Sequence, residues 1–191
     1  MRKVSFALDQ LSDSDVDWLA EMGHKESVPA GVSMIHEKKP SDSVYIVLSG
    51  ILSISVSIRG KQEVTRLGHG EIIGEMSFLK ARSSSTSVKA LDDSVVFAIP
   101  KRKLASKLEE DMSFAAHFYY VLAITLANRL RNTVVRLSSD RHMESDETPE
   151  HKDKPEARIP DTLYAADFRI DHILKRLMDV EPAVLQASED G

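Results

Sequence analysis

The sequence contains no cysteine, so disulfide bonds, thiolate zinc sites and cysteine nucleophiles are all excluded. It has no uninterrupted apolar run near the ~18 residues that a membrane span requires. The N-terminus begins with basic residues, but no apolar stretch of signal-peptide length follows them. These absences predict a protein without a membrane segment, located in a reducing compartment and by default in the cytoplasm.

The 191 residues carry a net charge of -5, whereas dedicated nucleic-acid binders usually present a basic face. Nucleic acid is therefore an improbable partner. The histidines are scattered without the spacing of metal ligands. No Ser–His–Asp or paired-carboxylate arrangement is recognisable. We accordingly predict no catalytic residue, no metal site, no cofactor and no enzyme activity.

Hydrophobic periodicity divides the chain into helical and strand-rich parts. Residues 5–25 have apolar side chains at helical spacing, and Pro29 and Gly31 end that pattern. From residue 32 to residue 99 the period changes to two, with short strands predicted over 44–48, 52–58, 64–67, 88–91 and 94–99. The serines that alternate along 53–57 are expected on the wet face of their strand. Short strands joined by polar turns indicate a sandwich or barrel.

Helical sequence returns after Pro100. A first helix is predicted over 101–109, and a second, capped by Asp111 or Ser113, over 113–138. Residues 139–160 are polar and charged, which predicts a disordered linker. An amphipathic helix is predicted over 161–180, followed by a tail over 181–191. Its apolar face is expected to be an interaction element, and it is formed by Leu163, Ala166, Ile170, Leu174 and Leu177.

The most informative segment is 70–79, in which Gly70 and Gly74 bracket two isoleucines and Glu75 opens a short helical stretch. Glycine lets the backbone approach a ligand closely, and the first amides of a helix attract an anion. Glu75 could accept hydrogen bonds from ribose hydroxyls. A hydroxyl-rich run follows over 83–87. The pattern favours a sugar-phosphate site, although a helix-start carboxylate and a solvated serine loop would give the same residues.

The order of these blocks resembles the cyclic nucleotide-binding domain family, the sensor β-roll of catabolite activator-type regulators. The resemblance covers residues 5–138 and is carried by the segments 45–50, 67–79 and 87–90. It implies an α+β, mainly β fold: an antiparallel, jelly-roll-like β-roll flanked by N-terminal helices and a long C-terminal helix. It also implies one domain over residues 1–138 and a cyclic AMP or cyclic GMP ligand.

In that family the cassette glycine and the residues after it offer backbone amides to the cyclic phosphate, and the glutamate accepts from the ribose 2′-hydroxyl. The long helix contributes residues near the base. The resemblance therefore implies a set of ligand-binding residues, namely Ile72, Ile73, Gly74, Glu75, Met76, Ser77, Arg82, Ser84, Ser85, Thr86, Thr125 and Asn128. Arg129, next to Asn128 in the same helix, is also expected near the base.

The sequence departs from the family where an arginine usually faces the phosphate, because Ser84 occupies that position and Arg82 lies two residues earlier. A guanidinium is the strongest side-chain clamp for phosphate, and a serine cannot replace its charge. Three alternatives stay open: Arg82 reaches the phosphate through a bulge, the hydroxyls of Ser84–Thr86 act with backbone amides, or the site is degenerate.

No winged helix-turn-helix, kinase, channel or cyclase pattern accompanies the domain in this sequence. We expect a stand-alone sensor in which the ligand moves the helix over 113–138. The partner would be a second copy bound through that helix, or a protein bound through the helix over 161–180, which could instead fold back on the roll as a lid. The alternatives are a pseudo-receptor scaffold that binds no nucleotide and an atypical transcriptional regulator.

Overall fold

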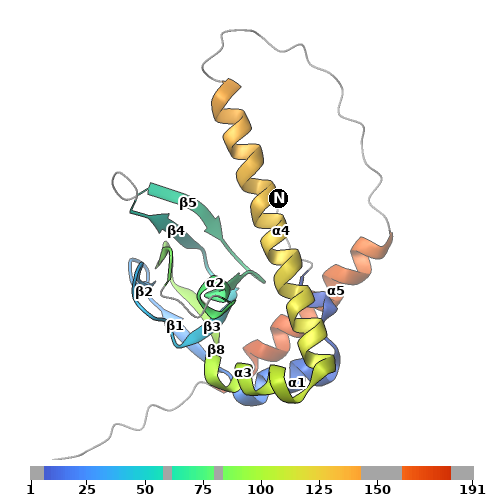
Figure 1. Cartoon of the computed structure of the whole chain (residues 1–191). Coiled ribbons are helices and arrows are strands. Elements are labelled where there is room, and N and C mark those ends of the chain that lie inside the picture. The colour runs from blue at the N-terminus through green and yellow to red at the C-terminus, as the bar shows by residue number, and fades with distance from the viewer. Residues whose placement is uncertain (1–6, 58–61, 80–83, 143–160, 182–191) are drawn as a thin grey trace, which may run out of the picture.

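The computed structural model describes residues 7–57, 62–79, 84–142 and 161–181. Within these residues, eight strands form two four-stranded sheets that face each other as a β-roll (Figure 1). The strand orders are β1-β8-β3-β6 and β2-β7-β4-β5, and every neighbouring pair is antiparallel. The strands are β1 (His24–Val28), β2 (Ser33–Ile35), β3 (Ser43–Ser49), β4 (Leu52–Val56), β5 (Gln62–Leu67), β6 (Ile72–Ile73), β7 (Ser87–Ala90) and β8 (Ser94–Pro100).

Helices cover one sheet and leave the roll open on the other side, and the predicted α+β, mainly β fold is confirmed (Figure 1). The helices are η1 (Leu8–Gln10), α1 (Asp13–Met22), α2 (Glu75–Leu79), α3 (Lys101–Glu110), α4 (Met112–His142) and α5 (Asp161–Met178). In the part of the chain that the structure describes, no helix is both long and apolar enough to span a bilayer.

Strand β3 has both faces buried, which explains its continuous apolar sequence. Val44, Ile46 and Leu48 point into a core shared with the helices. Val47 points the other way, into a second core between the two sheets. The site described below opens from this inter-sheet space, so one central strand supports both the helices and the pocket.

The structure corrects three local predictions. The N-terminal helix ends at Met22, and His24–Val28 is strand β1, because pairing with β8 overrides its polar sequence. Ser53 and Ser55 are buried rather than wet, in a strand that lies between β7 and β5; Ser53 Oγ donates to Glu63 Oε2 at 2.7 Å. Helix α4 continues to His142, four residues into the segment predicted as a linker. Most of that segment lies outside the described residues.

Helix α5 folds back onto its own domain. Its described apolar side chains join the helix-side core, and they are Ile170, Ile173, Leu174 and Leu177. The helix contacts η1, α1 and β3. Of the two placements left open by the sequence, the described part of α5 therefore occupies the fold-back position. The side chains of Leu163 and Ala166 lie outside the described residues.

Asp111 caps helix α4, because its Oδ1 accepts hydrogen bonds from the amides of Ser113 and Phe114, each at 3.0 Å. The hydrogen bond from Lys107 Nζ, followed by the Phe114 amide, holds the pKa of Asp111 below its usual range. A depressed folded-state pKa means that the stabilisation is present at neutral pH and is lost as the pH falls through that pKa.

We therefore expect Asp111→Ala to lower the melting temperature at pH 7, and to lower it progressively less as the pH is reduced towards 2.5. Asp111→Asn is the matched control, because asparagine caps helices about as well as aspartate but carries no charge. Thermal melts followed by circular dichroism across this pH range measure the effect. An alanine penalty that stays constant with pH would contradict the role of the charge.

Candidate functional site

The segment from Gly74 to Leu79 forms the short cassette that the sequence singles out. Gly74 has a φ of +87°, which favours glycine, and it ends β6 and starts α2. A Cβ at this position would lie 2.9 Å from the backbone oxygen of Ser43 on β3. Ser77 Oγ donates to the Gly74 carbonyl at 2.9 Å, which closes the first turn. The start of the cassette thus packs directly against the backbone of strand β3.

Lys101, the first residue of α3, braces the cassette from behind. Its Nζ donates to Ser77 Oγ at 2.8 Å and to the Ser41 carbonyl at 2.5 Å. Burial lowers the pKa of Lys101, whereas the nearby carboxylates of Asp42 and Glu75 act in the opposite direction. One ammonium group therefore connects α3, the loop before β3 and the cassette helix.

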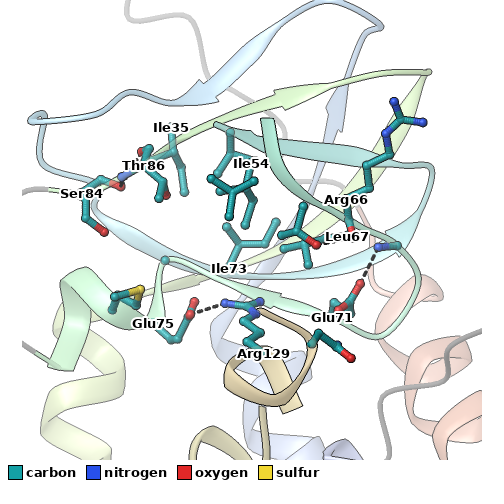
Figure 2. Close-up of a pocket in the computed structure, with 18 of the residues that line it drawn as sticks. Ile35, Ile54, Arg66, Leu67, Glu71, Ile73, Glu75, Ser84, Thr86 and Arg129 are labelled. Carbon is teal, nitrogen blue, oxygen red and sulfur yellow. Dashed lines mark hydrogen bonds and ion pairs between the residues drawn. The ribbon is translucent and has the colours of Figure 1, made fainter. Parts of the chain in front are cut away.

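A cavity of about 560 Å³ opens between the cassette, the second sheet and α4 (Figure 2). Ile35, Ile54 and Ile73 project into it from different strands (Figure 2). Polar groups are grouped around this apolar lining, and they are Thr65, Arg66, His69, Glu71, Glu75, Ser77, Ser84, Ser85, Thr86, Arg129, Asn132 and Thr133. An apolar pocket with convergent polar groups at its edge is typical of small-molecule sites.

Glu75 is buried in the wall of this cavity and pairs with Arg129 of α4 (Figure 2). Arg129 Nη1 donates to Glu75 Oε1, and Nη2 donates to the Ile72 carbonyl. The Arg129 Nε atom is buried without a hydrogen-bond partner among the described residues. A buried donor left unpaired costs roughly 1–3 kcal/mol.

The structure brings eight of the predicted binding residues together at the cavity, namely Ile73, Gly74, Glu75, Met76, Ser77, Ser84, Ser85 and Thr86. Ile72 takes part through its carbonyl, while its side chain belongs to the helix-side core. Thr125 is buried and donates to the Val121 carbonyl at 2.9 Å. Neither Thr125 nor Asn128 is among the lining residues. Arg82 lies outside the described residues.

Sequence reasoning missed Asn132 and Thr133, which line the cavity from α4. Thr133 lies one helical turn beyond Arg129, and its Oγ1 donates to the Arg129 carbonyl at 2.9 Å. Extending the face of Thr125 by i+4 and i+8 would have led to Arg129 and Thr133. Residues of β4 and β5 line the opposite wall of the cavity, such as Ile54 and Val64. The alternation of side chains along a strand could have indicated which of them point inward.

The sequence model described as "Cyclic nucleotide-binding domain" matches residues 25–111, the segment that contains the cassette and most of the cavity wall. Residues 25–111 are therefore similar to the cyclic nucleotide-binding domain family. A solved cyclic nucleotide-binding domain from Methylobacillus flagellatus superposes with a TM-score of 0.64 at 22% identity. That alignment covers 74% of this chain and 78% of the other, and it supports the fold.

Two longer curated proteins are similar to part of this chain. The cyclic AMP receptor protein of Thermus thermophilus is 29% identical over 129 residues, which is 66% of this chain and 58% of that protein. An uncharacterised NTE family protein of Mycobacterium tuberculosis is 30% identical over 109 residues, which is 57% of this chain but 18% of that protein. This chain therefore spans 58% of the first relative and 18% of the second.

Proposed function

We propose that this chain senses a cyclic nucleotide, cyclic AMP or cyclic GMP, through the cavity between the cassette and α4. The observation that carries the proposal is the pairing of a buried glutamate with an arginine of α4 inside an otherwise accessible cavity. A buried charge pair needs further hydrogen bonds to be compensated, and a polar ligand at the same corner supplies them. Its position in a cyclic nucleotide-binding domain favours this ligand class.

The cyclic phosphate would lie against the backbone of the cassette, near Gly74 and Ser77. The ribose 2′-hydroxyl would donate to Glu75, whose Oε1 also receives Arg129. The base would extend towards Asn132 and Thr133 at the α4 wall. This arrangement uses the apolar side chains of the strands for contact area and the polar groups at the edge for orientation.

In this proposal, hydroxyls and two nearby cations would support the phosphate. Ser84 Oγ donates to the Thr86 carbonyl at 2.7 Å, which orders the loop opposite the cassette. A bound anion together with the Glu75 carboxylate carries two negative charges, and Arg129 and Lys101 supply two positive charges nearby. We propose that this balance, with or without Arg82, compensates for the serine in the family's arginine position.

Ligand binding at this corner would be transmitted to α4, because Arg129 belongs to that helix. Leu130 and Val134 are large apolar residues of α4 that are 66% and 53% exposed. An exposed apolar row on a long helix fits a second copy of the same helix. We therefore propose a homodimer through α4 as the signalling form.

Isothermal titration calorimetry tests the proposed ligand. We expect heat with cyclic AMP or cyclic GMP, and a roughly 10- to 100-fold weaker affinity for Glu75→Gln, because a hydrogen bond to a charged acceptor contributes about 1.5–3 kcal/mol. The 2′-deoxy nucleotide, which lacks the hydroxyl that would donate to Glu75, should bind the wild type weakly. Its affinity for Glu75→Gln should be no lower than its affinity for the wild type. Glu109→Gln, on the exposed side of α3, is the matched control and should bind like the wild type.

A second candidate function is a scaffold without ligand, and one observation favours it: Arg129 already engages the carboxylate that a ribose would need. Absence of heat with both nucleotides at millimolar concentration would leave this scaffold as the better description. If Glu75→Gln lowers the affinities for the 2′-deoxy nucleotide and for the parent nucleotide by the same factor, Glu75 acts through the fold rather than by binding the ribose.

A further inference from the structure

The turn from Gly68 to Glu71 has the cavity on one side and helix α5 on the other. Gly68, His69 and Glu71 line the cavity. Gly70 faces the opposite way and is in contact range of α5: a methyl group placed on it would lie 3.5 Å from Leu174 Cδ1 and 4.0 Å from Ile170 Cγ2. The two surfaces are thus separated by a single layer of backbone.

This turn is tied to the central strand β3. The Gly70 amide donates to the Val47 carbonyl at 2.8 Å, and the Val47 amide donates to the Glu71 carbonyl at 2.9 Å. His69 Nδ1 lies 2.6 Å from the Leu48 carbonyl, so it must donate there. The other ring nitrogen, Nε2, then faces α5, at 3.8 Å from Asp171 Oδ1.

Helix α5 is held in this position by buried and polar contacts along its length. Leu174 and Ile170 are 2% and 0% exposed. Arg169 Nη2 donates to the Leu11 carbonyl at 2.7 Å, and Lys25 Nζ donates to the Met178 carbonyl at 2.6 Å. The stretch of α5 from Arg169 to Met178 is therefore anchored at both ends, and Ile170 and Leu174 within it lie against the turn.

We propose that α5 is coupled to occupancy of the cavity through the Gly68–Glu71 turn, an inference that rests on the proposed function. A ligand that contacts the cavity side of the turn limits the turn to one conformation. Leu174 and Asp171 of α5 contact the turn in that same conformation. Ligand binding therefore strengthens docking of α5, and docked α5 raises the affinity for the ligand by the same factor. Helix α5 is then an output element of the sensor, in addition to α4.

Hydrogen–deuterium exchange on the full chain tests the coupling. Saturating cyclic AMP, or cyclic GMP if that nucleotide gives the heat, should slow exchange of the α5 amides over 169–178 several-fold. In the free protein, Leu174→Asp should speed exchange of the turn over 67–73, because the carboxylate cannot enter the buried site against Gly70. This second measurement needs no ligand.

Asp171 in α5 and Asp179, the residue that follows the helix, are a matched pair for testing the nucleotide affinity. The Asp171 side chain is 70% exposed and faces His69, whereas Asp179 is an exposed residue just past the C-terminal end of α5. With a protonated His69 ring facing Asp171, we expect Asp171→Asn to weaken nucleotide binding by about two- to fivefold, as for an exposed ion pair, and Asp179→Asn to leave the affinity unchanged. Leu174→Asp should weaken it by about tenfold or more.

The outcomes separate this inference from the proposed function. Nucleotide binding with unchanged exchange in α5, and equal affinities for the two asparagine variants, would overturn the coupling and leave the sensor intact. If no nucleotide binds, the proposed function fails, and the coupling is judged by the turn: unchanged exchange over 67–73 in Leu174→Asp overturns it, and faster exchange supports it.

Discussion

Arg129→Met is expected to destabilise the fold by about 3 kcal/mol, because it leaves the buried Glu75 carboxylate without its cation. The estimate is at the low end of the range for buried pairs, since the Arg129 side chain is 21% exposed. For a domain of this size the melting temperature should fall by roughly 6–12 °C. The Glu75→Gln/Arg129→Met double variant should recover part of the loss, because the unpaired charge is gone.

Arg131→Met is the matched control, since Arg131 is exposed on the same helix two residues further on. It should melt within about 2 °C of the wild type, as expected for a surface substitution. Melting curves of the two methionine variants, recorded without ligand, decide the matter. If they coincide, Arg129 does not stabilise Glu75, and the cavity corner is organised in another way.

Gly74→Ala is expected to have the second large effect, by lifting the cassette from the sheet. Its positive φ is strained for alanine, at a cost of about 1–3 kcal/mol. The added Cβ would also lie 2.9 Å from the Ser43 backbone oxygen, which cannot move without disturbing β3. We expect lower stability and, under the proposed function, at least a tenfold loss of cyclic nucleotide affinity.

Gly31→Ala separates these two causes. Gly31 has a similar φ of +84°, but the nearest heavy atom to an added Cβ is 4.0 Å away. This variant should show only the conformational cost and keep its ligand affinity. Calorimetry and chemical denaturation of both variants measure the difference. Equal stabilities would mean that the close approach of Gly74 to β3 is not required.

The sequence allowed the roll and the long helix to be predicted because their apolar patterns are regular. The double-sided burial of β3 gives a continuous run, and the helix face over 114–122 repeats at helical spacing. Strand β1 could not be found in this way, since His24, Lys25 and Glu26 carry no alternating apolar pattern. It becomes a strand only because β8 offers an edge for pairing.

The cassette was predictable because Gly74 and Glu75 are adjacent in sequence and act through local backbone geometry. The pairing of Glu75 with Arg129 was not, because 54 residues separate them and the contact depends on how α4 crosses the roll. The same is true of the contact between Gly70 and Leu174. A short motif can therefore be recognised in the sequence, whereas the distant residues that contact it depend on tertiary packing.

The contact between Arg129 and Glu75 fixes a point 13 residues before the end of the 31-residue helix α4. At 1.5 Å per residue, about 20 Å of helix extends beyond this pivot. A tilt of about 10° at the pivot would displace the far end by roughly 3 Å, close to the width of a side-chain contact. A small adjustment around one carboxylate is thereby magnified into a change of register that a neighbouring molecule can detect.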